Sequence, residues 1–127
     1  MKLIIDTNIL IDYSKGYTKL LSSLLENQFK NQVELYVNPV IVAEFFTDRT
    51  LRSMHKLATA HEFINLFKVV DLTKQTGLLA GEFLRQKYVL YLADALISAS
   101  CILVKAQLVT RNTSDFAKVP GLVFYKV

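Results

Sequence analysis

The sequence predicts an α/β fold, a three-layer sandwich in which helices cover both faces of a central parallel sheet of about five strands. Short apolar segments alternate along the chain with segments of helical length. The apolar segments are continuous runs, which is the pattern of strands that are buried on both faces of a sheet. A chain of 127 residues, of which 52% are hydrophobic and 20% are charged, is long enough to bury one core, so we expect a single domain over residues 1–127.

Five segments have the composition of buried strands, over residues 3–5, 33–37, 68–72, 107–110 and 122–125. Six helices are expected between them, over residues 7–14, 18–30, 39–47, 50–67, 73–87 and 91–106. Two of the helix starts have a local cause. Pro39 suits the first position of a helix that Asn38 caps, and Thr73 can cap the helix that carries Leu78, Leu79 and Phe83.

The composition also excludes several classes of protein. There is no polar low-complexity tract, and no apolar run approaches the roughly 18 residues that a membrane span needs, so we expect no membrane partner. The N-terminus reaches Asp6 after three apolar residues, too soon for a signal peptide. The single cysteine, Cys101, cannot form an internal disulfide, which favours a cytoplasmic protein. A formal net charge of +4 fits a polyanionic partner without requiring one.

Four of the eleven acidic residues have apolar sequence leading into them or around them. Asp6 follows the first strand, Glu44 lies in a helix that is apolar nearly all round, Asp94 lies in the most apolar helix, and Asp115 comes just beyond the fourth strand. Each has an alternative, purely structural explanation. Asp6 and Asp94 can cap helices, Glu44 can reach solvent at a helix edge, and Asp115 can be a loop or cap residue.

The geometry of a parallel sheet connects these four acids. Ligands of doubly wound sheets bind beyond the carboxyl ends of the strands, where Asp6 and Asp115 are expected and where helices carrying Glu44 and Asp94 can face them. Like charges about 4 Å apart cost roughly 4 kcal/mol per pair at an effective dielectric near 20, so protons or a cation must compensate them. Oxygen ligands alone favour Mg²⁺ or Mn²⁺. Asp12, near the end of the first helix, is expected to be an unrelated surface residue.

The basic residues indicate what the site acts on. With the four acids set aside, fifteen basic residues remain against seven acidic ones. A basic surface around an acidic metal site suits a phosphodiester, because lysine and arginine bind phosphates while the acids hold the metal. Arg111, beside the site, is the main candidate for a phosphate contact; further candidates are Lys15, Lys19, Arg49 and Arg52.

At these residues the sequence resembles the PIN-domain ribonucleases, and in size it resembles the VapC-type toxins of type II toxin–antitoxin systems. The matching motifs are IDTN at residues 5–8, PVIVAE at 39–44, ADALISA at 93–99 and LVTRNTSDF at 108–116. Any one of these motifs alone is weak evidence. Four of them in the family's order, spread over the whole chain, are specific.

The resemblance implies a PIN-like fold and a metal-dependent endoribonuclease that cleaves RNA by means of a metal-activated water. It implies that Mg²⁺ or Mn²⁺ is held by Asp6, Glu44, Asp94 and Asp115, with Asp6 and Asp94 as the principal ligands. Asn8 and Thr110 match positions where the family carries polar side chains that orient these acids. Asn112 occupies a position where many relatives have an aspartate, so the last acidic position is open between Asn112 and Asp115.

The resemblance also implies two kinds of protein partner. One is a second copy of the chain, because the helix over residues 39–47 carries more apolar surface than one core contact needs. The other is a cognate antitoxin, whose segment would lie in an apolar groove near Phe45 and Phe46 and place a cationic side chain among the acids.

Three other functions fit the sequence less well. A receiver-type signalling domain would place a phospho-accepting aspartate at Asp71, but such domains have paired acids after the first strand, and here Asp6 is followed by Thr7 and Asn8. The asparagine at position 8 also disfavours a phosphatase with an Asp-x-Asp start. A non-catalytic RNA-binding or assembly module keeps the fold, and the four intact acids argue against it.

Overall fold

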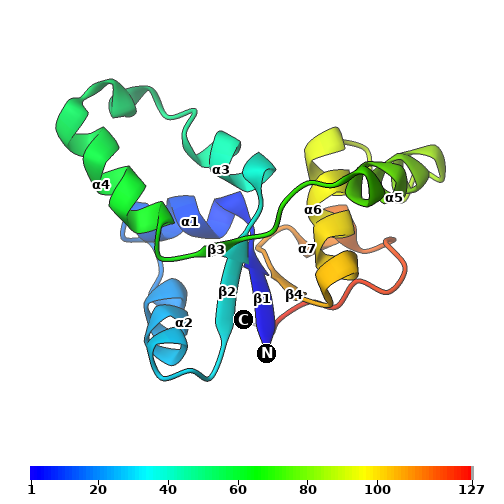
Figure 1. The fold of residues 1–127 in the computed structure, drawn as a ribbon, viewed down its shortest axis with the longest axis horizontal. Helices are drawn as coiled ribbons and strands as arrows, with labels where there is room; N and C mark the ends of the chain where they lie inside the picture. The colour runs from blue at the N-terminus through cyan, green and yellow to red at the C-terminus, as the bar shows by residue number, and fades with distance from the viewer. Residues whose placement is uncertain (127) are drawn as a thin grey trace.

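The computed structural model describes residues 1–126 and contains a four-stranded parallel sheet (Figure 1). Its strands are β1 (Lys2–Ile5), β2 (Glu34–Val37), β3 (Lys68–Val69) and β4 (Gln107–Val109), in the spatial order β3-β2-β1-β4. The predicted α/β fold with a parallel sheet is confirmed. The expected fifth strand over residues 122–125 is reduced to one parallel bridge between Leu108 and Phe124 at the outer side of β4, so the sheet has four strands instead of about five.

Helices cover both faces of this sheet. They are α1 (Thr7–Ser14), α2 (Leu20–Phe29), α3 (Pro39–Phe45), α4 (Met54–Ile64), α5 (Lys74–Arg85), α6 (Leu92–Val104) and α7 (Thr113–Phe116), with a 3-10 helix η1 at Arg49–Arg52. Figure 1 shows α1, α2 and α4 on one side of the strands and α5, α6 and α7 on the other. None of the helices formed by residues 1–126 combines the length and the apolar character that crossing a membrane would require.

Two helical segments differ from the sequence prediction. The helix expected over residues 50–67 is interrupted at Ser53, whose backbone is extended and whose side chain caps α4 by accepting a hydrogen bond from the Lys56 N–H. The short helix α7 was not expected, because four residues are too few to show an apolar period.

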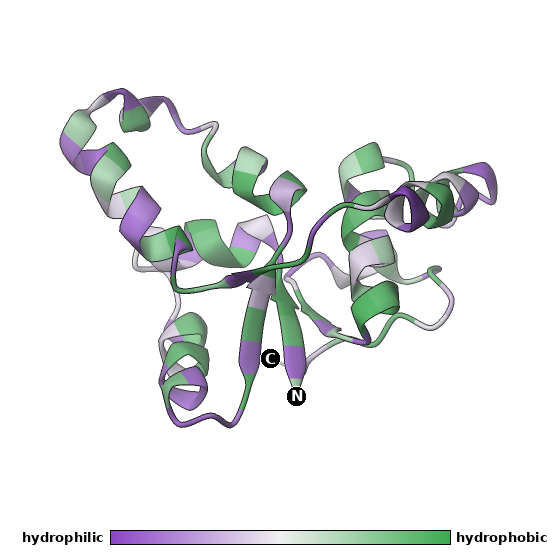
Figure 2. Ribbon diagram, in the orientation of Figure 1, coloured by the Kyte–Doolittle hydropathy of each residue, from purple (hydrophilic) through white to green (hydrophobic). Residues whose placement is uncertain are grey.

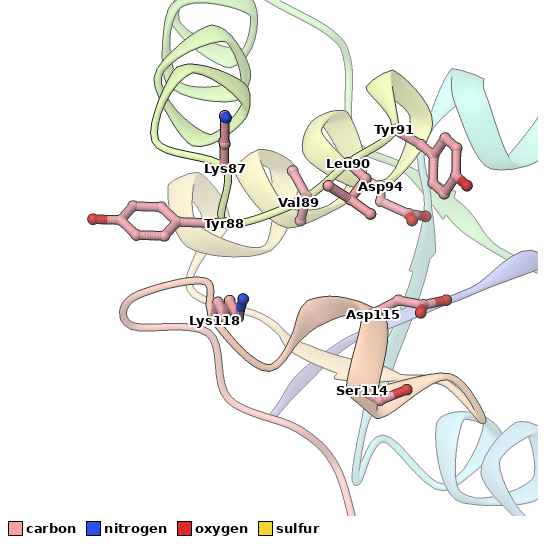
Figure 3. Close-up of a pocket in the computed structure, with 9 residues that line it drawn as sticks. All are labelled: Lys87, Tyr88, Val89, Leu90, Tyr91, Asp94, Ser114, Asp115 and Lys118. Atoms are coloured by element: carbon pink, nitrogen blue, oxygen red, sulfur yellow. The ribbon is translucent and has the colours of Figure 1, made fainter.

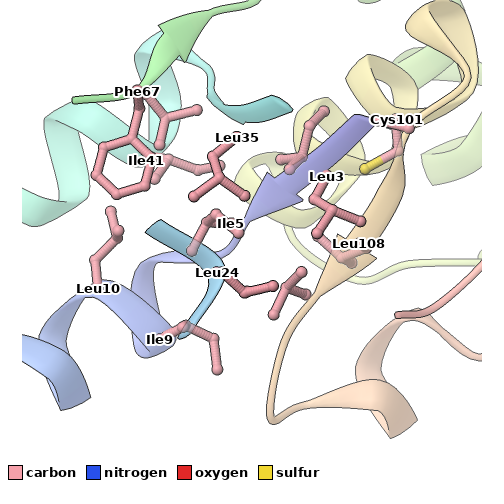
Figure 4. Close-up of a cluster of buried hydrophobic side chains, with 14 of the residues drawn as sticks. Leu3, Ile5, Ile9, Leu10, Leu24, Leu35, Ile41, Phe67, Cys101 and Leu108 are labelled. Atoms are coloured by element: carbon pink, nitrogen blue, oxygen red, sulfur yellow. The ribbon is translucent and has the colours of Figure 1, made fainter. Parts of the chain in front are cut away.

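The main core is built from the strands and the helices on either side of them (Figure 4). Leu3, Ile5, Leu35 and Leu108 come from the sheet and are fully buried. They pack against side chains of α1, α2, α3 and α6, and Cys101 on α6 is buried among them. Figure 2 shows the same distribution, with apolar residues along the strands and on α6 and polar residues toward the outer ends of α4 and α5. A second, smaller cluster joins α5 to α6.

A buried hydrogen-bonded pair links the helices that carry two of the candidate acids. Asn38 follows β2 and caps α3, where its Oδ1 accepts a hydrogen bond of 2.9 Å from the Ile41 N–H. Its Nδ2 donates to the Ser100 hydroxyl on α6 over 3.0 Å, and that hydroxyl donates to the Leu96 carbonyl. Since Asn38 and Ser100 are both fully buried, this pair holds α3 against α6 at the carboxyl end of the sheet.

We therefore expect Asn38→Ala to lower the free energy of unfolding by about 2–3 kcal/mol, because it removes a helix cap and leaves a buried hydroxyl without one of its partners. The matched control is Ser53→Ala, which removes an exposed cap with a 3.5 Å hydrogen bond and should cost at most about 1 kcal/mol. Urea denaturation of both variants measures the difference. Equal losses would show that the Asn38–Ser100 contact adds nothing to capping.

Candidate active site

Asp6 lies at the carboxyl end of β1, and its side chain is 6% exposed. One carboxylate oxygen, Oδ1, accepts the Thr7 N–H at 2.8 Å and so caps α1. The other, Oδ2, accepts hydrogen bonds from the Thr110 hydroxyl at 2.7 Å and from Asn8 Nδ2 at 3.1 Å. The cap explanation and the site explanation of Asp6 are therefore compatible, because the two oxygens serve different partners.

The Thr110 hydroxyl has its hydrogen-bonding capacity filled. It accepts hydrogen bonds from Asn8 Nδ2 at 3.2 Å and from the Asn112 N–H at 3.1 Å, and a hydroxyl has a single proton to donate. That proton is directed to Asp6, which fixes the orientation of the carboxylate. The structure thus places Asn8 and Thr110, both predicted to orient the acids, directly against Asp6.

Glu44 reaches the same region from α3. Its side chain is exposed, as the alternative explanation had it, but its Oε1 also accepts a hydrogen bond of 2.7 Å from the Thr7 hydroxyl at the start of α1. The part played by Thr7 was not predicted from the sequence. Its position directly after Asp6, on the first turn of α1, was the available signal.

Asp94 is half-buried in the first turn of α6. It does not cap the helix, because Tyr91 occupies the cap position. Burial, together with the nearby negative charges of Asp6, Asp115 and Glu44, raises the pKa of Asp94 to about 6. Burial also raises the pKa of Asp6, and Glu44 adds to the rise, although hydrogen bonds from Thr110 and Thr7 oppose it. The negative charges of Asp6, Asp115 and Glu44 therefore all act on Asp94.

Asp115 lies in the first turn of α7, is exposed, and lines a cavity of about 170 Å³ together with Asp94. Figure 3 shows the two carboxylates at the same end of this cavity, pointing in the same direction. Asn112 precedes α7, and its side chain makes no capping hydrogen bond. Of the two candidates for the last acidic position, Asp115 lines the cavity that Asp94 lines, and Asn112 does not.

The charges of these acids are not neutralised by basic side chains. Within residues 1–126, none of the four carboxylates takes part in an ion pair. Arg111, the expected phosphate contact beside the site, instead pairs with Asp12, with 2.7 Å between Arg111 Nε and Asp12 Oδ2. The Asp12 side chain is 14% exposed, so the expectation that it is an unrelated surface residue was wrong. Asn8 and Asp12 are four residues apart on α1, and Asn8 Oδ1 accepts the Arg111 N–H, so one face of the helix holds Arg111 twice.

The donor set suits a hard divalent cation. Its ligands are carboxylate oxygens, which Mg²⁺ and Mn²⁺ prefer, and their combined negative potential lacks a counter-charge from the described part of the chain. No three acidic, histidine or cysteine side chains of residues 1–126 are already arranged around one metal position. Asp6 is held in place by its hydrogen bonds, and the exposed Glu44 and Asp115 side chains would complete the ligand set around such a cation.

Comparisons with known proteins show which proteins this chain is similar to in sequence and fold. The chain is 24% identical over 132 aligned positions to the protein called Ribonuclease VapC from Rickettsia bellii, covering 96% of this chain and 93% of that protein. Its fold is similar to VapBC2 from Rickettsia felis, solved bound to a DNA fragment from its promoter, with a TM-score of 0.82, 22% identity and 98% of each chain covered. It is also similar to a toxin–antitoxin complex from Klebsiella pneumoniae, with a TM-score of 0.77 and 28% identity, covering 98% of this chain and 99% of that chain.

The family comparison covers nearly the entire chain. The model of the PIN domain matches residues 3–122, a span that begins in β1 and includes all four candidate acids. Its extent agrees with the four motifs from which the resemblance was predicted, and with the parallel sheet on whose carboxyl edge the acids lie. This chain therefore belongs to the PIN domain family.

Proposed function

We propose that this protein is a metal-dependent endoribonuclease and the toxin of a VapC-type toxin–antitoxin pair. The observation that carries the proposal is the group of four carboxylates in which the charges of Asp6, Asp115 and Glu44, together with burial, raise the pKa of Asp94, and in which none has an ion-pair partner among the described residues. Similarity to Ribonuclease VapC along 96% of the chain supports RNA as the substrate. The family match argues against the receiver-type alternative.

Each acid has a distinct part in holding Mg²⁺ or Mn²⁺. Asp6 and Asp94 are the principal ligands, and Glu44 and Asp115 complete the negative site. When bound, the cation lowers the pKa of a water for attack on phosphorus and offsets charge on the leaving oxygen. Thr110 and Asn8 hold the Asp6 carboxylate in one orientation before any ligand arrives, and Thr7 keeps Glu44 beside it. The Asp6 carboxylate therefore needs little change of orientation when a ligand binds.

Arg111 is proposed to bind a phosphate of the RNA. Asp12 pairs with its Nε, and because the side chain is 59% exposed, the five-donor guanidinium can also reach another acceptor. The main-chain hydrogen bond from Arg111 to Asn8 keeps this cation at the edge of the acidic site.

We predict that the purified protein cleaves single-stranded RNA with Mg²⁺ or Mn²⁺ and not in EDTA. Asp94→Asn should lower kcat/KM by more than about 100-fold, since even residues that only support a metal ligand are worth about 10–100-fold. The variant should stay folded, because removing one of several like charges relieves repulsion. Cleavage is measured with a labelled oligoribonucleotide.

The matched control is Glu26→Gln, which removes an equal charge from an exposed ion pair with Lys30 on α2. Its activity should equal that of the wild-type protein. Full activity in EDTA, or in folded Asp94→Asn, would refute the nuclease proposal.

A groove beside the acids supports an antitoxin partner. It has a volume of about 1120 Å³ and is lined by Glu44, by apolar and aromatic side chains of α1, α3 and α4 such as Tyr13, Phe45 and Phe63, and by polar and basic side chains that include Lys15 and Lys56. Phe46, expected to line it with Phe45, packs against the His61 ring instead, with 5.0 Å between ring centroids, so that part of the prediction was wrong. We propose that an apolar antitoxin segment occupies this groove and brings a basic side chain to Glu44.

Because Phe46 does not line the groove, the partner proposal is tested at Thr59, an exposed residue of α4 that does. Thr59→Arg should weaken inhibition by the protein encoded in the adjacent upstream reading frame by about 10-fold or more, since it adds bulk and a charge that repels a basic segment. RNA cleavage should be unchanged. Ala58→Arg is the control, because Ala58 is exposed on the same helix and does not line the groove. Equal inhibition of both variants would place the partner elsewhere.

A homodimer stays a prediction, but the apolar surface that would support it is not the one expected from the sequence. On α3, Val42 and Phe45 pack against the core, so this helix does not have the spare apolar surface that was expected of it. Exposed apolar side chains lie instead at Leu78 on α5 and at Leu92 at the start of α6, and neither of them lines the cavity that holds Asp94 and Asp115.

A further inference from the structure

A cavity extends from the carboxylates along the segment that joins α5 to α6 (Figure 3). Asp94 and Asp115 form one end, and Lys118 lies at the other end, just beyond α7. Residues 87–91 form the facing wall. The volume of about 170 Å³ is far too small for a duplex.

We propose that this cavity is a subsite for the nucleotide adjacent to the scissile bond of single-stranded RNA, and that Lys118 binds its phosphate; the proposal rests on the nuclease function proposed above. With a cation compensating Asp94 and Asp115, the scissile phosphate is held at the acidic end. The strand then continues past the facing wall, and its neighbouring phosphate meets the ammonium group of Lys118. A lysine ammonium is a compact point charge that suits a single phosphate.

The lysine is available for such a contact. Within residues 1–126, Lys118 forms no ion pair, although two carboxylates line the same cavity. The ammonium group of Lys118 is therefore separated from the two carboxylates along the cavity and is not neutralised by an ion pair with either of them. Lys87 also lines the cavity, but Figure 3 shows its side chain directed toward α5, so the phosphate contact is assigned to Lys118.

The wall opposite Lys118 is suited to a ribose and an unstacked base. Val89 is buried and anchors the segment, while Leu90 and Tyr91 are 78% and 67% exposed. Figure 3 places the Tyr91 ring next to Asp94, at the acidic end. An exposed aromatic ring is a platform on which a base of any identity can stack, so this wall would select for single-stranded RNA without selecting its sequence.

The test uses a set of oligoribonucleotides in which one phosphate at a time is replaced by a neutral methylphosphonate. The cleavage site is first mapped with the wild-type protein and Mg²⁺. Binding is then measured with Mg²⁺ by fluorescence polarisation, on oligoribonucleotides in which a methylene group replaces the bridging leaving oxygen of the scissile bond, so that the bond cannot be cut. For the wild-type protein, one replacement adjacent to the scissile phosphate should weaken binding about 5- to 10-fold. Lys118→Ala should weaken binding of unmodified RNA by the same factor and should lose its sensitivity to that replacement. The slope of log Kobs against log salt concentration should be smaller in magnitude by about 0.7 for Lys118→Ala than for the wild-type protein.

Two further proteins make the result decisive. Lys118→Gln keeps the length of the side chain without its charge and should behave as Lys118→Ala does. Lys30→Ala removes an equal charge from α2 and should keep the wild-type pattern at every phosphate. If the loss of affinity caused by Lys118→Ala multiplies with the loss caused by each methylphosphonate, the lysine acts independently of every phosphate. That result refutes the subsite while the nuclease function stands. If the wild-type protein cleaves no RNA with metal, it is the proposed function that fails.

Discussion

The hydrogen bonds that hold one buried carboxylate at the carboxyl end of β1, close to other acidic side chains, are the constraint on which the candidate site depends. Asp6 is almost completely buried and takes hydrogen bonds from Thr7, Asn8 and Thr110, which belong to α1 and to the end of β4. The Asp6 N–H also donates to the Val109 carbonyl over 2.9 Å, so the ends of β1 and β4 are level. These donors favour the charged form of Asp6 and so oppose the rise in its pKa that burial causes.

The other acids are brought to Asp6 by contacts that carry no charge. Asn38 and Ser100 hold α3 against α6, and the Thr7 hydroxyl holds Glu44 on α3. The apolar faces of α6 then leave Asp94 half-buried beside Asp6. A core that brings like charges together reduces its own stability, since each such contact opposes folding until a cation compensates it. This arrangement is expected where binding a cation matters more than the stability of the free protein.

Several features of this arrangement were predictable from the sequence and several were not. The buried strands have continuous apolar runs, and Asp6 follows the first of them, so its place at the sheet edge followed from the pattern alone. The break at Ser53 depends on one exposed cap that competes weakly with helix continuation. The Asp12–Arg111 pair joins residues far apart in the chain, which no local pattern records. Whether Phe45 or Phe46 lines the groove depends on about 100° of helix rotation, which only the packing against α4 decides.

The central claim is that these carboxylates repel one another and thereby form a cation site, and comparing the unfolding midpoints of wild-type protein and Asp94→Asn tests it most directly. At pH 7.5 the Asp94 carboxyl, whose pKa is about 6, is ionised. In EDTA the variant should be at least as stable as the wild-type protein, because one repelling charge is gone. In Mn²⁺ the order should reverse, because only the wild-type site binds the ion with its full set of charges. A wild-type protein that is the more stable of the two in EDTA, or that gains no stability from Mn²⁺, would contradict this account.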